Sequence, residues 1–287
     1  MRKLVIVMTV ITGLLVASCN SNKKKNSEST KKELSIGMEE GWAEGVAMSY
    51  VAKDILQREG YDVKIQNASV DLIFTSLHNG DLDVFMDVWL PKTHAKKLEK
   101  YPDIDSLGVS FDNAKIGLVV PDYVTINSIE ELNANKAKFD GKIIGIESGA
   151  GITAATKQAI KDYHLDFKLM TSSSIAMLSE LQKAIQEKRW VVVTGWAPHW
   201  KFGRFQLKFL EDPKKDYGET ERIETYSRKG FKKDDPTAAA FFSKIHFDDA
   251  TMADLLAKME EGKDNKEAVA KAWVDSHQEL VNTWLGK

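Results

Sequence analysis

Three tryptophans occupy equivalent places in the chain, where each could form one wall of a site for a cation. Trp42, Trp89 and Trp196 each follow a segment with strand character and precede a helix or a turn. An indole face carries a negative quadrupole and no acceptor lone pair, so it suits a diffuse cation that cannot donate hydrogen bonds. A single tryptophan of this kind is more often core packing. Three at equivalent places can form a prism around one ligand.

The second of these tryptophans belongs to the stretch from Asp83 to His94. Its apolar run predicts a buried strand that ends near Trp89. Pro91 then ends the strand, because proline has no N–H to donate to a neighbouring strand. His94 follows within reach of the same place, so this stretch brings an aromatic wall and a polar ring together.

A glycine-rich segment, Glu147 to Ile152, joins a predicted strand to a predicted helix. Its glycines allow a tight turn, and the amides of Gly151 and Ile152 would then point outward at the helix N-terminus. A carboxylate fits there. A plain turn whose glycines serve only the backbone is the alternative. The spacing is neither a dinucleotide fingerprint nor a nucleophile elbow.

Alternating strands and helices must position these residues. The periodicity predicts two successive sets of strand–helix–strand units, which imply mostly parallel sheets flanked by helices. In such sheets ligands bind outside the carboxyl ends of the strands, which is where the tryptophans fall. The predicted strands are 34–38, 63–65, 83–90, 114–121, 142–147, 167–170 and 190–195, with a possible edge strand at 208–210. The predicted helices between them are 46–60, 70–80, 152–163 and 175–188, and Ser128 opens a further short helix through a capping box.

The pattern restarts after Val119 to Pro121, which we interpret as a lobe boundary. We predict a first lobe of residues 33–120 and 223–287, and a second lobe of residues 121–222. The last part of the chain is expected to be helical over 238–245, 251–259 and 267–285. Trp273 and Trp284 lie on one stripe of the last helix and are expected to be core residues.

The N-terminus predicts export. Residues 1–18 have a short positive region, an apolar run and small residues before Cys19, which is typical of a lipoprotein signal peptide. Cys19 is the only cysteine, so lipidation explains it better than a disulfide. Residues 19–32 are polar and read as a lipidated tether. A domain tethered outside the cytoplasmic membrane has no ready supply of ATP or NAD, so no cofactor is expected.

The formal net charge of −2 and the lack of a basic cluster argue against nucleic acid as a partner. Small molecules are favoured instead. A hydrolase would need a nucleophile with a base, or a metal site, but the six histidines are scattered without a ligand spacing. His94 and His199 could in principle share a metal ion, but the sequence shows no carboxylate pattern near them that would complete such a site. We therefore expect neither an enzyme nor a metal site, and a lipid-anchored hydrolase is the minor alternative.

Four segments together resemble the glycine betaine-binding proteins of ABC transporters. They are Trp42 ahead of Gly60-Tyr61, Asp87-Val88-Trp89-Leu90-Pro91-Lys92-Thr93-His94, Gly149-Ala150-Gly151-Ile152, and Gly195-Trp196-Ala197-Pro198-His199-Trp200. The resemblance extends from about Leu34 to the C-terminus. It implies a two-lobed periplasmic-binding-protein fold, similar to type II, that closes on a quaternary ammonium osmoprotectant and delivers it to a membrane permease. With the N-terminal signal, we expect the chain to act as a lipid-anchored monomer that faces the periplasm or the cell exterior.

The resemblance also implies roles for individual residues. It places Trp42, Trp89 and Trp196 around a trimethylammonium group, and it places the amides of Gly151 and Ile152 with the ring of His94 on a carboxylate. His199 and Trp200 match the family pattern without an assigned ligand contact, and a loop-fixing hydrogen bond is the expected role of His199. Family members differ over betaines, choline and carnitine. A receptor for sugars or amino acids is the other alternative, but sugar sites need more Asp, Asn or Arg beside the aromatics.

Overall fold

The computed structural model describes residues 32–287. The predicted signal peptide, Cys19 and nearly all of the predicted tether lie outside the described residues. The last tether residue, Lys32, is the first residue of strand β1 (Lys32–Met38). No helix within residues 32–287 is long and apolar enough to cross a membrane.

The first lobe is built around three parallel strands in the order β2-β1-β3. Strands β2 (Tyr61–Asn67) and β3 (Val84–Leu90) follow helices α1 (Ala43–Arg58) and α2 (Val70–Asn79), and α3 (Ala95–Lys100) comes next. All seven residues of β3 are buried, as its largely apolar sequence predicts, and Asp87 is the one charged residue type among them. Helix α2 ends at Gly80, whose φ of 82° is a left-handed conformation that glycine adopts without strain. The strand–helix alternation predicted here is confirmed.

The second lobe repeats this arrangement with shorter strands. Strands β5 (Lys142–Ile144), β6 (Lys168–Met170) and β7 (Val193–Ala197) are parallel, with β5 in the middle. Helices α4 (Gly151–Asp162) and α5 (Ser174–Gln186) connect them, and α6 (Lys201–Arg204) and β8 (Leu207–Phe209) follow. The predicted capping box at Ser128 is present, but it opens two 3-10 segments, Ile129–Glu131 and Asn133–Phe139.

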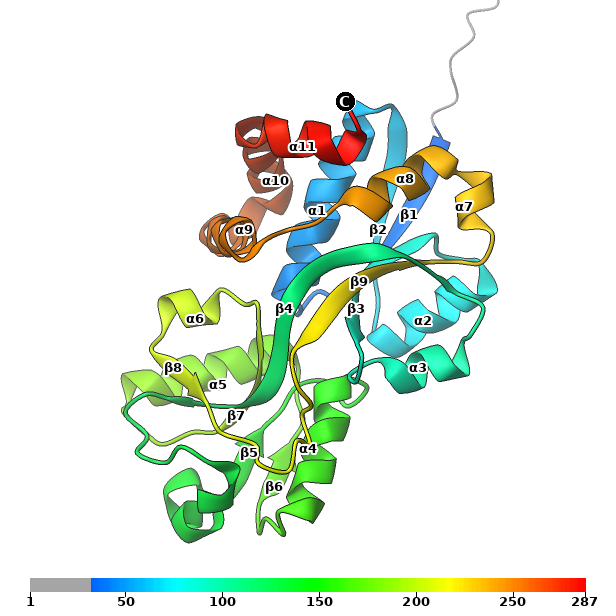
Figure 1. Cartoon of the computed structure of the whole chain (residues 1–287). Coiled ribbons are helices and arrows are strands. Elements are labelled where there is room, and N and C mark those ends of the chain that lie inside the picture. The colour runs from blue at the N-terminus through cyan, green and yellow to red at the C-terminus, as the bar shows by residue number, and fades with distance from the viewer. Residues whose placement is uncertain (1–31) are drawn as a thin grey trace, which may run out of the picture. The chain divides into compact units, whose positions relative to one another are not determined.

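Two strands run antiparallel to their neighbours and connect the lobes, as Figure 1 shows. Strand β4 (Asp105–Pro121) pairs with β9 (Glu221–Ser227) through its first part and with β7 and β8 through its last part. Strand β9 also pairs with β3. The three core strands of each lobe are parallel and flanked by helices, as expected, and the antiparallel pairs of β4 and β9 make the sheets mixed. The sequence pattern missed this because β4 crosses both lobes, and its first part lacks a simple alternation. The partner change in β4 falls between Ala114 and Lys115, and the predicted lobe limits remain predictions.

The C-terminal part packs beside α1 as a set of helices (Figure 1). The bounds are α7 Phe231–Asp234, α8 Pro236–Lys244, α9 Asp249–Glu261, α10 Lys266–Ser276 and α11 Gln278–Leu285. The prediction of one helix over 267–285 is wrong, because His277 leaves the helical conformation and its ring stacks 4.0 Å from that of Trp273. Trp273 and Trp284 are buried against Phe247, so their predicted core role is confirmed.

Candidate functional site

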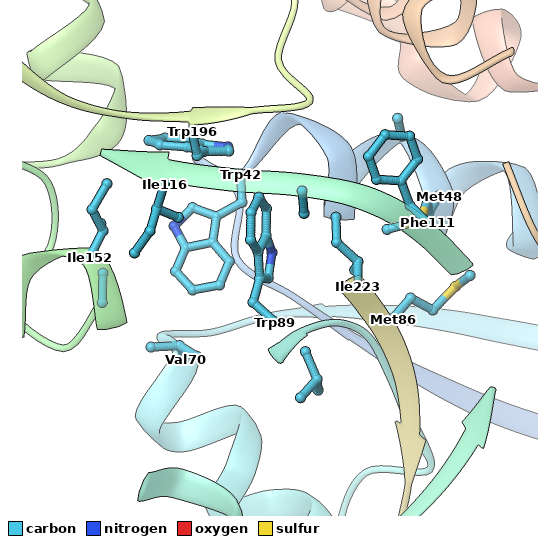
Figure 2. Packing of buried hydrophobic residues seen from close by; sticks show 14 of the residues in the cluster. Trp42, Met48, Val70, Met86, Trp89, Phe111, Ile116, Ile152, Trp196 and Ile223 are labelled. Carbon is cyan, nitrogen blue, oxygen red and sulfur yellow. The ribbon is translucent and has the colours of Figure 1, made fainter. Parts of the chain in front are cut away.

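One cavity between the lobes is lined by all six residues for which the sequence predicts ligand contacts. They are Trp42, Trp89, His94, Gly151, Ile152 and Trp196. The cavity is small in this closed arrangement, with about 30 Å³ open to the centres of water-sized spheres. Figure 2 shows the indoles of Trp42 and Trp89 with Ile116 and Ile152 beside them. The first lobe supplies two tryptophans and the second lobe supplies the third.

The three indoles reach the cavity from different kinds of element. Trp42 is the N-cap residue of α1, Trp89 is the penultimate residue of β3, and Trp196 lies within β7. The prediction that Trp196 follows its strand is therefore off by one or two residues. All three are at most 6% exposed. Burial alone would fit core packing, but the shared cavity gives their faces a common space to line.

Two buried carboxylates hold two of the indole rings. Trp89 Nε1 donates to Asp87 Oδ1 at 2.6 Å, and Trp196 Nε1 donates to Glu44 Oε2 at 2.9 Å. Sequence reasoning missed both acids. Asp87 could have been found, because residues two apart on a strand lie on the same face. Glu44 could not, because it lies in the other lobe, 152 residues from Trp196 in the sequence.

Burial sets the protonation of these acids. It raises the pKa of Glu44 to about 7, although the amide and indole N–H groups and the charge of Lys201 oppose the rise. It raises the pKa of Asp87 well above its usual range, and the charge of Glu44 adds to this. The cavity wall therefore combines aromatic faces with a carboxyl group, Glu44, that becomes ionised near neutral pH.

The ring of His94 is fully buried, and its orientation is fixed by the backbone of Trp89. His94 Nδ1 accepts a hydrogen bond from Trp89 N at 2.9 Å, while His94 N donates to Trp89 O at 2.9 Å. A neutral ring that accepts at Nδ1 carries its proton on Nε2. Within residues 32–287, His94 Nε2 has no hydrogen-bond partner. The ring therefore offers one N–H donor to the cavity that it lines.

His94 stays neutral across the physiological range. Burial lowers the pKa of His94 to about 3, and the positive charge of Lys97 adds to the effect. Its ring stacks against that of Trp42, with 5.7 Å between centroids and 11° between planes. This stacking fixes the plane of Trp42, whose Nε1 has no hydrogen-bond partner in the described part of the chain.

Glu221 at the start of β9 holds the turn before His94. Its Oε1 accepts from Lys92 N at 2.6 Å and from Thr93 N at 2.7 Å, and its Oε2 accepts from Thr93 Oγ1. Glu221 is 2% exposed. The turn that presents His94 is therefore anchored to a strand that connects the lobes, which no local sequence signal indicates.

The start of α4 closes the cavity beside the turn that precedes His94. Gly151 and Ile152 are the first residues of this helix, so their amides have no acceptor within it. A β-carbon on Gly151 would lie 2.5 Å from Thr93 O, so only glycine lets α4 approach the turn this closely. The predicted glycine loop therefore has a packing reason at Gly151 as well as the amide geometry required for an anion.

Two more glycines allow close contact between the lobes. A β-carbon on Gly41 would lie 2.6 Å from Ser174 Cβ, and one on Gly149 would lie 2.6 Å from Asp71 Oδ2. In each pair one residue belongs to the first lobe and the other to the second. The lobes are therefore closed on each other around the cavity.

His199 and Trp200 do not line this cavity. His199 is buried, and its Nδ1 accepts from Lys201 N at 3.0 Å, which is a loop-fixing hydrogen bond of the predicted kind. Its ring meets that of Trp196 edge to face at 5.0 Å. Among residues 32–287, no group of three or more His, Cys, Asp or Glu side chains is arranged to hold a metal ion.

Comparisons with known proteins agree with this geometry. A family model described as the substrate binding domain of ABC-type glycine betaine transport systems matches residues 32–276. The glycine betaine/carnitine transport binding protein GbuC of Listeria monocytogenes is 48% identical over 145 residues. That alignment covers 50% of this chain and 48% of GbuC, so it spans about half of the relative's length.

Two solved structures are similar over most of the chain. The glycine betaine, L-proline-binding protein ProX of Borrelia burgdorferi has a TM-score of 0.85 and 32% identity, covering 88% of this chain and 96% of its own. Lactococcal OpuAC, solved in a closed conformation with glycine betaine, has a TM-score of 0.83 and 36% identity. It covers 89% of this chain and 100% of its own.

The state of His94 gives a direct prediction. The pKa of about 3 lies below the ordinary value of 6.5, so the folded protein favours the neutral ring. Its contribution to stability is complete above about pH 6.5 and is lost as the pH falls toward 3. Nitrogen-15 NMR of the His94 ring should show the Nε2-protonated neutral form throughout pH 8 to 5. A ring that takes up a proton near pH 6.5 would contradict this.

Proposed function

The chain belongs to the family of substrate-binding domains of ABC-type glycine betaine transport systems, and we propose that it captures glycine betaine or a closely related betaine between its lobes. Members of this family are solute-binding proteins of transport systems and not enzymes. One observation carries the proposal. A single interlobe cavity is lined by three indoles, by the N–H of a neutral histidine and by the free amides of a helix N-terminus.

The two ends of this cavity suit the two ends of a betaine. The faces of Trp42, Trp89 and Trp196 receive the trimethylammonium group, which has methyl groups and no N–H to satisfy. The amides of Gly151 and Ile152 and the Nε2–H of His94 donate to the carboxylate. A neutral His94 suits this role because it provides a donor without adding a buried charge.

Rough magnitudes are consistent with useful affinity. Each desolvated cation–π contact contributes about 2 kcal/mol. Hydrogen bonds to a charged carboxylate add about 1.5–3 kcal/mol each. After the costs of association, a dissociation constant near micromolar, or about −8 kcal/mol, is a reasonable expectation.

The ligand would pass to an ABC permease, and we propose that the chain acts as a monomer that is lipid-anchored to a membrane of the cell envelope and faces the periplasm or the cell exterior. The lipid anchor rests on Cys19 and the preceding apolar run. Metabolic labelling with a fatty acid analogue tests the anchor. Label should enter the wild-type chain and be absent from Cys19→Ser.

The second candidate function is a receptor specific for choline or carnitine. The carboxyl group of Glu44 in the cavity wall favours choline, because this group can attract a cation that has no carboxylate of its own. Carnitine carries a carboxylate and would use the same donors as glycine betaine. Calorimetric titration with glycine betaine, choline, carnitine and maltose separates these possibilities. We expect the largest affinity for glycine betaine, and binding of maltose alone would refute the whole class.

Trp89→Ala should remove most of the affinity for glycine betaine while the protein stays folded. The loss should be about 30-fold or more, because one desolvated wall and the packing of its neighbours are removed. Calorimetry and thermal unfolding measure the two effects. Trp284→Ala is the matched control, because it costs about 3–5 kcal/mol of stability in the core and should leave the affinity unchanged. An unfolded Trp89→Ala protein would mean that Trp89 serves the core.

His94→Ala should weaken glycine betaine by about ten- to hundredfold and choline much less, because choline has no carboxylate to accept the Nε2–H. The ratio of the two dissociation constants is the measurement, since general damage to the cavity would change both alike. His78→Ala is the control, because His78 lies on the surface beside Asp103. Equal losses for the two ligands would contradict the carboxylate role of His94.

Gly41→Ala should hinder closure of the lobes. The added β-carbon meets Ser174, and relieving that contact costs about 1–3 kcal/mol, so affinity should fall about five- to hundredfold. X-ray scattering with and without glycine betaine should show less ligand-induced compaction than in the wild type. Gly203→Ala is the matched control, because nothing lies within 4 Å of a β-carbon there. Normal compaction and affinity in Gly41→Ala would contradict the closure argument.

A further inference from the structure

Lys201 is a buried lysine for which the binding site as described has no use. It is the first residue of α6 and 0% exposed. Its Nζ donates to Trp196 O at 2.9 Å and lies 4.2 Å from the centroid of the Trp196 ring. A buried ammonium group is costly unless its surroundings compensate. This amine has one carbonyl, two aromatic rings and the nearby charge of Glu44.

The amine approaches the Trp196 ring from outside the cavity wall. Trp196 and Glu44 line the cavity and Lys201 does not, although its amine is within 4.2 Å of the ring. One indole therefore has both the amine and the proposed cation position beside it. Glu44 contacts the same indole at its N–H. A lysine, a carboxylate and the ligand thus share one tryptophan.

Burial brings the pKa values of both Lys201 and Glu44 close to neutrality. It lowers the pKa of Lys201 to about 7, against the effect of the Glu44 charge. It raises the pKa of Glu44 to about 7 as well. Two positive charges beside one indole repel each other with little water between them. The proton of the Lys201–Glu44 pair is therefore the charge that an incoming cation displaces most easily.

We propose that Lys201 is a proton-exchanging residue of the binding site, so that a quaternary ammonium ligand entering the cavity beside Trp196 takes the place of the proton on Lys201. The ammonium group of Lys201 becomes an amine, its proton leaves to solvent, and Glu44 is ionised in the liganded pair. The ligand then supplies the positive charge that Glu44 requires. This inference rests on the proposed function.

The other titratable groups near the Lys201–Glu44 pair can be told apart from it as sources of a released proton. Burial and Lys201 keep the pKa of His199 well below its usual range, and His94 is likewise neutral. Asp87 couples to Glu44 from β3. Burial and the charge of Glu147 raise the pKa of Glu39 to about 7, so Glu39 is the other possible proton source. It has no contact with Lys201, so a variant of Lys201 leaves its proton in place.

The sign of the pH dependence follows from the exchange. The liganded pair holds fewer protons than the empty pair, so affinity should rise with pH until the empty pair is deprotonated. Below about pH 7 the affinity should fall by up to about tenfold per pH unit.

Calorimetry of glycine betaine binding at pH 6.5, in buffers of different ionisation enthalpy, counts the protons released. We expect between about one-half and one proton for the wild type. Lys201→Arg keeps the charge and the donor to Trp196 O but cannot lose a proton, so it should release none and bind more weakly. A lysine with a purely structural role would tolerate arginine, with release unchanged.

The number of protons released by the wild type and by Lys201→Arg supports or overturns the proton exchange at Lys201. Binding without proton release in the wild type overturns the exchange and leaves the proposed function intact. Unchanged release in Lys201→Arg assigns the proton to another group, such as Glu39, and also overturns it. If Lys201→Arg does not fold, Glu44→Gln replaces it, because a neutral partner leaves Lys201 uncharged and should abolish release. No binding of glycine betaine at all contradicts the proposed function itself.

Discussion

The hydrogen bond from Trp196 Nε1 to Glu44 Oε2 is the contact on which the site depends. It joins the second lobe to the first and sets the third aromatic wall opposite the other two. The contact forms only when the lobes are closed, and the closed arrangement leaves no room for a β-carbon at Gly41 beside Ser174 or at Gly151 beside Thr93. The fold therefore assembles the cation site and closes around it in the same movement.

The proposed carboxylate end of the cavity is formed separately, by contacts that are mostly local in the sequence. Trp89 and His94 exchange two hydrogen bonds through the turn between them, and Glu221 fixes that turn from β9. One residue pair thus supplies a wall for the proposed cation position and a donor for the proposed carboxylate position. Because β9 connects the lobes, the donor is also positioned by the element that would bend on opening.

Much of this site could be predicted from the sequence, because strand ends and helix starts are local signals. Trp42, Trp89 and Trp196 were found from their places after strands, and Gly151 from the glycine loop. Their meeting in one cavity required the two-lobed fold. Glu44, Glu221 and Lys201 were not predicted, because their partners lie on other elements and a charged residue in a sequence gives no sign of burial. The antiparallel course of β4 and β9 was missed for the same reason, since strand pairing is a long-range property.

We expect one property of the cavity above all, namely that it selects a cation without N–H groups. Titration of the protein with glycine betaine, dimethylglycine and glycine tests it most directly, because the carboxylate stays constant while methyl groups are removed. Indole faces cannot replace the water lost by an N–H, and the Glu44 oxygen nearest Trp196 already accepts its indole N–H. Affinity should therefore fall from glycine betaine to dimethylglycine, and glycine should not bind measurably. Equal affinity for glycine would contradict the account.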